Sequence, residues 1–142
     1  LALNKPYECS DPNPHSSSWR QGLNNGSWAQ DSLNCFATGS SSEFPKFVTI
    51  DLEKIETISK VRVGAPSFGS TKTIAIELSQ DGENFITVGE YVFSQKRNEE
   101  KMFAFEPVQA KYLRLSYLDY YPSRVNYPEH YMFTTELEAY EY

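Results

Sequence analysis

The chain has 142 residues, a net charge of −6 and 15% aromatic residues, among them ten tyrosines and nine phenylalanines. This length suits a single domain spanning residues 1–142 with a substantial core. The negative charge argues against nucleic acid and anionic lipid as partners, and no apolar run approaches the ~20 residues of a membrane helix. The first residues, LALNKP, already resemble a folded segment, so we expect the chain to be a piece of a longer protein or a processed one.

From residue 47 onward, short segments alternate between apolar and polar residues. This period of two places the apolar side chains on one face of a strand. In chain order the segments are FVTIDL (47–52), ISKVRV (58–63), TIAIEL (73–78), FITVGEYVF (85–93), KMFAF (101–105), KYLRLSY (111–117) and FTTELEAYEY (133–142). Turn signals such as Asp81-Gly82 lie between them, and no segment has a helical period. The chain is therefore predicted to be an all-β sandwich or barrel.

Three segments do not fit the strand pattern: residues 10–34, 65–71 and 119–131. The first and third are long for loops, and long ordered loops in a compact domain usually carry function. Both tryptophans, both histidines and much of the tyrosine surplus fall within them. We therefore expect binding to take place on these loops.

Catalytic patterns are weak. The two histidines, His15 and His130, form no metalloprotease motif, and the APSFG around Ser67 lacks both the first glycine and the following helix of a nucleophile elbow. Glu136 and Glu138 share a face of the last strand, as a pair of carboxylates for glycoside hydrolysis would. A solvated sheet face or one structural carboxylate explains them better. With no convincing base or nucleophile, the chain is predicted not to be an enzyme.

The stretch GLNNGSW (22–28) is a turn with three interpretations. Asn25-Gly26 is a strong turn signal, and Asn25-Gly26-Ser27 is also an acceptor for an N-linked glycan. The surrounding oxygen-bearing side chains could instead hold a calcium ion. These side chains belong to Asn24, Asn25, Ser27, Asp31, Ser32 and Asn34. Because turns are always rich in such residues, composition alone favours an ordinary turn over a calcium site.

The order of several motifs resembles the discoidin, or coagulation factor V/VIII C-type, family of galactose-binding-like domains. An opening ALNKP is followed by a tight turn, the strand FVTIDL, the pair V-x-V, the turn SQDGENF, the segment AKYLRL and a closing ELEAY. These occupy Ala2–Pro6, Asn25-Gly26, Phe47–Leu52, Val61–Val63, Ser79–Phe85, Ala110–Leu115 and Glu136–Tyr140. The resemblance implies a jelly-roll β-sandwich with about eight main antiparallel strands, closest to bacterial carbohydrate-binding modules.

The same resemblance implies a structural Ca²⁺ that joins the turn to the last strand. Carried over by position, its ligands are the following residues: Gly22, Asn25, Ser27, Asp31, Thr135 and Glu136. Asn25 stands where the family has an aspartate, so one negative charge is missing unless Asp31 restores it. A weaker Ca²⁺ site, a sodium ion or no ion are the alternatives. An Asn25 side chain turned toward an ion would not carry a glycan.

Family members of this kind bind sugars through loops at one end of the sandwich. A sugar needs an aromatic surface and a few fixed polar groups. We expect these to come from Trp19, Arg20, Phe68, Tyr121, Arg124, Tyr127 and His130. Each has an alternative role, since Trp19 could cap the core and tyrosines beside Pro122 and Pro128 could stiffen their loop.

The two cysteines, Cys9 and Cys35, are either free thiols or one disulfide that ties the N-terminal segment to the sheet. A secreted, periplasmic or cell-surface setting, as the resemblance implies, favours the disulfide. The prediction is thus a non-catalytic module that captures a glycan, of galactose type or related, and targets an attached enzyme. The alternative is a structural or protein-interaction domain that packs against a catalytic domain.

Overall fold

The computed structural model describes residues 3, 5–10, 23, 36–38, 45–65, 71–93, 99–120 and 132–141. In these residues the regular structure is entirely β. The strands are β1 (Tyr7–Cys9), β2 (Phe36–Ala37), β3 (Lys46–Ala65), β4 (Thr73–Ser79), β5 (Ile86–Val92), β6 (Glu99–Tyr117), β7 (Phe133–Thr134) and β8 (Glu136–Tyr140). Within the described part of the chain, no helix is long and apolar enough to span a membrane.

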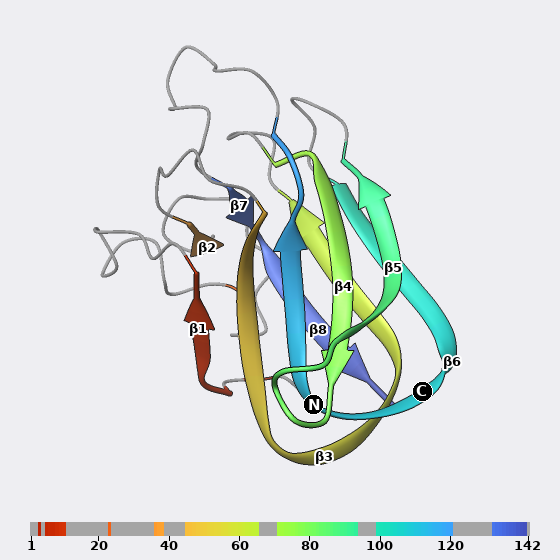
Figure 1. The fold of residues 1–142 in the computed structure, drawn as a ribbon. Helices are drawn as coiled ribbons and strands as arrows, with labels where there is room; N and C mark the ends of the chain where they lie inside the picture. The colour runs from red at the N-terminus through yellow and green to blue at the C-terminus, as the bar shows by residue number, and fades with distance from the viewer. Residues whose placement is uncertain are drawn as a thin grey trace.

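Two long, curved strands, β3 and β6, run antiparallel to each other through both layers of the molecule (Figure 1). Their pairing has register shifts between Asp51 and Glu56 and again between Ile58 and Lys60. At the first shift, Glu53 has a φ of 73°, and its amide donates to the Asp51 carboxylate over 2.8 Å. Bulges of this kind bend a strand and increase its twist. They allow one strand pair to turn from one layer into the other.

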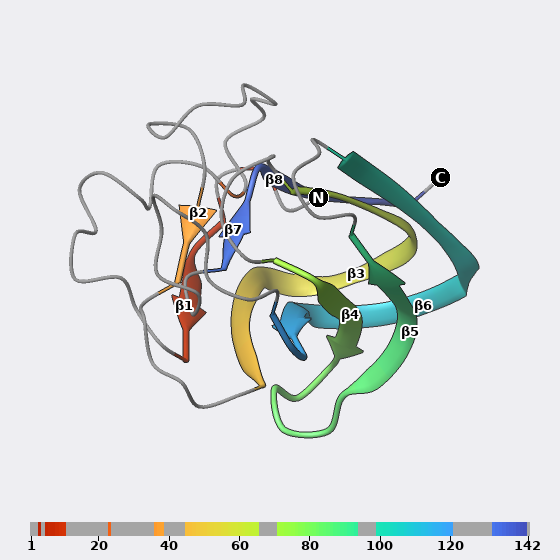
Figure 2. The same ribbon diagram turned by 90° about the horizontal axis from the view of Figure 1, so that it is seen from above.

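The two layers are distinct when the molecule is seen from above (Figure 2). In the first layer the strand order is β1-β3-β6-β4-β5, and in the second β8 pairs with the C-terminal half of β3. A small antiparallel pair of β2 and β7 lies beside them. Antiparallel pairing and the two-layer arrangement confirm the predicted jelly-roll β-sandwich.

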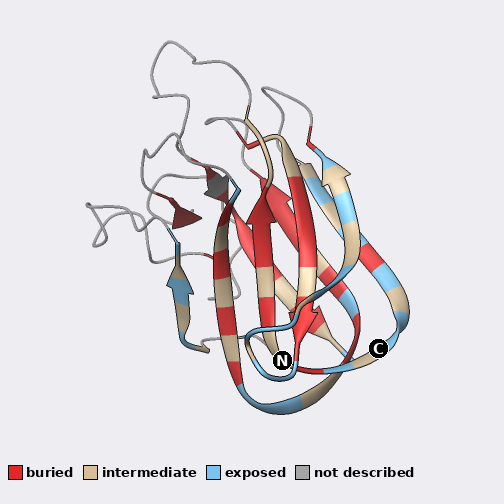
Figure 3. Cartoon of the chain, viewed as in Figure 1, coloured by how far each residue is buried: buried red, intermediate tan, exposed pale blue. Residues whose placement is uncertain are grey.

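Alternation along the strands places the core between the layers. Val48, Ile50 and Leu52 on β3 are fully buried, while the residues between them face outward. Burial is concentrated in the central strands, whereas β1 and β5 consist of half-buried and exposed residues and the bend of β3 is exposed (Figure 3). At the core edge, the hydroxyls of Tyr117 and Thr134 share a hydrogen bond of 2.5 Å, and burial raises the pKa of the tyrosine.

The inward-facing residues predicted from sequence are the buried ones, since Ile74, Ile76, Leu78, Leu113 and Leu115 have no more than 1% exposure. One difference concerns strand length. Four segments predicted as separate strands merge into two, because 47–52 and 58–63 both lie in β3, and 101–105 and 111–117 both lie in β6. A turn was expected at each join, but the chain bulges and stays hydrogen-bonded.

Candidate functional site

Leu23 and β8 lie side by side, although they come from opposite ends of the sequence. Leu23 forms a parallel bridge with Glu136, and its carbonyl accepts a hydrogen bond from the amide of Leu137, with an N···O distance of 2.5 Å. The Leu23 side chain is fully buried, and its φ of 73° lies in the left-handed region, which a leucine rarely adopts. Packing in the core therefore holds a strained backbone at this point.

Thr135 and Glu136, two of the predicted calcium ligands, are both fully buried here. The amide of Thr135 donates to the Gly64 carbonyl over 2.9 Å, which fixes the start of β8 against the end of β3. The other predicted ligands, Gly22, Asn25, Ser27 and Asp31, lie outside the described residues. Leu23, which is described, contacts the end of β8 that carries Glu136.

The described part of this site fits a calcium ion. A carboxylate removed from water is costly unless a cation or hydrogen-bond donors compensate its charge. Carboxylate and carbonyl oxygens are the ligands that Ca²⁺ prefers. Among the described residues, no three Cys, His, Asp or Glu side chains gather into a metal site. A cage around Glu136 would therefore draw on oxygen atoms of the 22–31 segment.

Glu138 has a structural environment rather than that of a catalytic acid. Its carboxylate lies 3.7 Å from the Arg62 guanidinium and accepts a hydrogen bond from the Tyr140 hydroxyl. Arg62 also pairs with Glu100 at 2.6 Å, and these contacts raise the pKa of the guanidinium. The register confirms that Glu136 and Glu138 lie on the same face, yet one is buried and the other is held in an ion-pair cluster on the surface of the second layer.

Each of the three predicted binding loops has one described flank at the same end of the first layer. Ser10 donates its amide to the Phe47 carbonyl over 2.8 Å, and Thr71 forms a bridge with Tyr120. Lys46 and Tyr117, which begin β3 and end β6, are paired at the same end. One described flank of each predicted binding loop therefore lies at this end of the first layer.

The residues predicted to contact sugar all lie outside the described residues. They are Trp19, Arg20, Phe68, Tyr121, Arg124, Tyr127 and His130. The predicted disulfide is also untested, because Cys35 lies outside the described residues. Its predicted partner Cys9 is half-buried in β1 opposite Val48. The binding roles and the disulfide therefore stay predictions.

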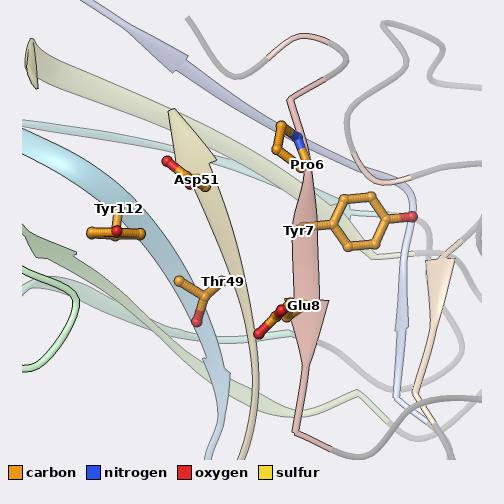
Figure 4. Close-up of a pocket in the computed structure, with 6 residues that line it drawn as sticks. All are labelled: Pro6, Tyr7, Glu8, Thr49, Asp51 and Tyr112. Carbon is orange, nitrogen blue, oxygen red and sulfur yellow. The ribbon is translucent and has the colours of Figure 1, made fainter. Parts of the chain in front are cut away.

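The outer face of the first layer carries two adjoining hollows of about 410 and 460 Å³. Glu8, Thr49 and Tyr112 line both, so the two form one continuous groove, which we call the sheet groove. The first hollow also reaches Asp51, and the second extends to the β4–β5 turn. Figure 4 shows Glu8, Thr49 and Tyr112 around the first hollow, with the Tyr7 ring turned away from them.

Arg114 forms part of the groove wall as the centre of an aromatic stack. Its guanidinium carbon lies 4.0 Å from the centroid of Phe47 and 3.7 Å from that of Phe85. Its Nε donates to the Thr49 hydroxyl over 3.0 Å. Partial burial lowers the pKa of Arg114, and the nearby Glu77 carboxylate opposes that shift. The stack fixes this side chain at the centre of the face.

The sheet groove is formed by outward-facing residues, which the inward-facing apolar pattern of the sequence does not reveal. In KYLRLSY the positions that alternate with the core residues are Tyr112, Arg114 and Ser116. The first two are a half-buried aromatic residue and a half-buried cation, and Ser116 is buried. An aromatic residue at an outward position of a central strand was the available signal. The role of the Asp81-Gly82 turn in the wall depends on register and could not be read from spacing.

Comparison with known proteins places this fold in a family. Residues 17–115 match the family model of F5/F8 C-type, NedA-like galactose-binding domains. The chain belongs to this family. Among proteins with curated descriptions, none matches the sequence significantly.

Solved structures resemble this galactose-binding domain over almost its whole length. Chitosan-binding module 1 of a chitosanase/glucanase from Paenibacillus sp. IK-5 has a TM-score of 0.73 at 20% identity, covering 98% of this chain and 96% of that one. The module CpGH89CBM32-5 from Clostridium perfringens, solved with GalNAc-β-1,3-galactose, has a TM-score of 0.73 at 19% identity, covering 96% and 95%. The CBM32 of AlyQ, solved with 4,5-unsaturated mannuronic acid, has a TM-score of 0.71 at 14% identity, covering 100% and 99%. At these identities the likeness establishes a common fold.

Proposed function

We propose that this domain is a non-catalytic carbohydrate-binding module. The observation that carries the proposal is its membership of the galactose-binding domain family, together with a fold shared over nearly full length with modules solved as sugar binders. Among the solved neighbours, one carries a galactose-containing disaccharide and another chitotriose. A galactose-type or related sugar is our choice of ligand for this chain.

The arrangement of strand ends supports a binding site on the loops. One described flank of each of the segments 10–34, 65–71 and 119–131 lies at the same end of the first layer, namely Ser10, Thr71 and Tyr120. The start of β1 and the end of β8 lie toward the opposite end (Figure 1). A domain attached through either terminus would leave the loop end open to a glycan. Trp19, Tyr121 and Tyr127 are then the stacking surfaces, with Arg20, Arg124 and His130 as polar anchors.

A calcium ion at Glu136 is part of the same proposal, with a structural role. Its ligands are the Glu136 carboxylate, oxygen atoms of Thr135 and the predicted ligands between residues 22 and 31. The fully buried carboxylate and the bridge from Leu23 to β8 support this assignment. When bound, the ion neutralises Glu136 and ties the first loop to the last strand, which fixes the base of the binding loops.

We also propose that the module is secreted or held at the cell surface, and that it targets an attached glycoside-active enzyme. The Paenibacillus neighbour is derived from such an enzyme, a chitosanase/glucanase. A second candidate function is a structural domain that packs against a catalytic partner. It is favoured by the polar cluster of Arg62, Glu100 and Glu138 on the second layer, which could meet another domain.

A glycan array separates the two functions. We expect the fluorescently labelled domain to bind a restricted set of glycans, and Trp19→Ala or Tyr127→Ala to remove that binding without lowering the midpoint of thermal unfolding by more than a few degrees. Met102→Ala, an exposed change on the second layer, is the matched control and should bind as the wild type does. A folded wild-type domain that binds no glycan would favour the structural role.

A further inference from the structure

The sheet groove has the features of a second binding site, separate from the loops. It crosses β1, β3 and β6 and ends at the turn between β4 and β5. Its two hollows, about 410 and 460 Å³, each fall within the size range of small-ligand sites. Because they share three lining residues, an elongated ligand could occupy both.

Tyr112 is the aromatic surface at the centre of the groove. It lines both hollows and is half-buried, so part of its side chain remains accessible. Gly82, with a φ of 81°, lies against it so closely that a Cβ there would come within 3.2 Å of the ring. The turn therefore supports the tyrosine from one side and restricts its movement.

The charge of the groove is predominantly negative. Four carboxylates line it, namely Glu8, Asp51, Asp81 and Glu83. Two cations oppose them: the Arg114 guanidinium in the wall, and the Lys111 ammonium, which lies over the Tyr112 ring at 5.5 Å from its centroid. Arg114 is already engaged by two rings, by Thr49 and by the field of Glu77. The carboxylates come from β1, β3 and the β4–β5 turn, so they are distributed along the groove and do not converge on one point.

The four carboxylates differ in how they are held. Asp51 accepts the amide of Glu53, and Asp81 accepts the amides of Glu83 and Asn84, each at 2.8 Å, so both are fixed in place. Glu8 and Glu83 are exposed side chains at the two sides of the groove. Fixed charges in the wall and adjustable charges at the rim suit a ligand with several separated cationic groups.

We propose that the sheet groove binds an oligosaccharide that carries free amino groups. Ammonium groups of the sugar would pair with Glu8 and Glu83, and the apolar face of one ring would contact Tyr112. The preference for a sugar over a basic peptide rests on the proposed function of the domain. The preference for an amino sugar over a neutral or acidic one rests on the charge of the groove alone.

The test compares two matched probes, the trimer of glucosamine and the trimer of N-acetylglucosamine. Binding of each is measured from the amide chemical shifts of the isotopically labelled domain. We expect the free-amine trimer to shift the amides of Thr49, Gly82 and Tyr112, and the acetylated trimer to leave them unchanged. The double variant Glu8→Gln/Glu83→Gln should weaken binding about tenfold or more, because two charge-assisted contacts are lost. Glu106→Gln, an exposed carboxylate on β6 that does not line the groove, is the control and should bind as the wild type does.

Three results would overturn this inference: equal groove shifts with both trimers, unchanged affinity in the double variant, or a lysine tripeptide that binds the groove as well as the amino sugar does. Tyr112→Ala provides an independent readout of the ring contact, with thermal unfolding to verify the fold. If glycans bind on the array while the chemical shifts of the groove amides do not change, this inference fails and the proposed function stands. If no glycan binds at all, the proposed function itself fails.

Discussion

The Leu137 amide donates a hydrogen bond to the Leu23 carbonyl, which joins the first long loop to the last strand of the sandwich. The neighbouring Glu136 forms the bridge with Leu23 and is fully buried. This contact places Leu23, the one described residue between 11 and 35, next to the carboxylate predicted to complete the calcium site. It also explains why a leucine keeps a positive φ, since the core on one side and β8 on the other fix its position.

Calcium should stabilise the domain through Glu136. We expect the midpoint of thermal unfolding to rise when calcium replaces chelator, because an ion bound only to the folded state shifts the equilibrium toward it. Glu136→Gln should remove most of that rise. Glu138→Gln, two residues away on the same face, is the control and should keep it. A rise of equal size in Glu136→Gln would place the ion elsewhere.

Leu23→Ala should destabilise the domain by about 2–5 kcal/mol, as for other fully buried leucines. Urea denaturation measures this loss. Leu23→Gly tests the strain separately, since glycine adopts a positive φ without cost and should recover part of the loss relative to the alanine variant. If the glycine variant is the less stable of the two, the backbone at this position is not strained.

Gly89→Ala should be costly although the residue lies on an exposed edge strand. A Cβ at this position would come within 2.3 Å of the Phe103 ring, which belongs to the core between the layers. Displacing a packed ring typically costs about 1–3 kcal/mol. The double variant Gly89→Ala/Phe103→Leu should lose less than the sum of its single changes, as a double-mutant cycle in urea would measure. Simple additivity would show that the two residues do not interact.

Asp81 should make the stability of the domain depend on acid pH. The backbone amides of Asn84 and Glu83, and then the side chains of Asn84 and Ser79, hold the pKa of its carboxyl below the ordinary value of 3.8. The folded state therefore favours the ionised form. This contribution is complete above the ordinary pKa and is lost as the pH falls below it toward the lower, folded pKa.

The comparison with Asp81→Asn measures this effect. The free energy of unfolding should differ most between wild type and variant near neutral pH, and the difference should narrow below pH ~4 as the unfolded wild type takes up a proton. Urea titrations across this range provide the measurement. A difference that stays constant with pH would mean that the hydrogen bonds at Asp81 do not depend on its charge.

Sequence alone predicted the fold class and the core positions, because period-two alternation determines which side chains face inward. Ile50 and Leu115 are buried for that reason. It did not predict that β3 and β6 each continue through a bend. The apolar pattern stops after Leu52, and a bulge with Glu53 in a left-handed conformation cannot be distinguished from a turn by composition.

One candidate site could be predicted from the sequence and the other could not. The family resemblance predicted that the 22–28 turn approaches Glu136, and the bridge between Leu23 and Glu136 agrees with that prediction. The sheet groove could not be predicted from the sequence, because it depends on which residues of three strands and a turn become neighbours. Tyr112, Gly82 and Glu8 are far apart in sequence, and only the pairing register brings them together.

The central claim is that the folded domain binds a glycan at a defined site, and isothermal titration calorimetry tests it most directly. The titration uses the strongest ligand from the array, with the wild type and Trp19→Ala compared in calcium. We predict saturable binding of one ligand at the loop end for the wild type, weakened at least tenfold in the variant because a stacking surface is lost. If the wild type unfolds cooperatively but shows no saturable binding heat with any ligand tried, the account is contradicted.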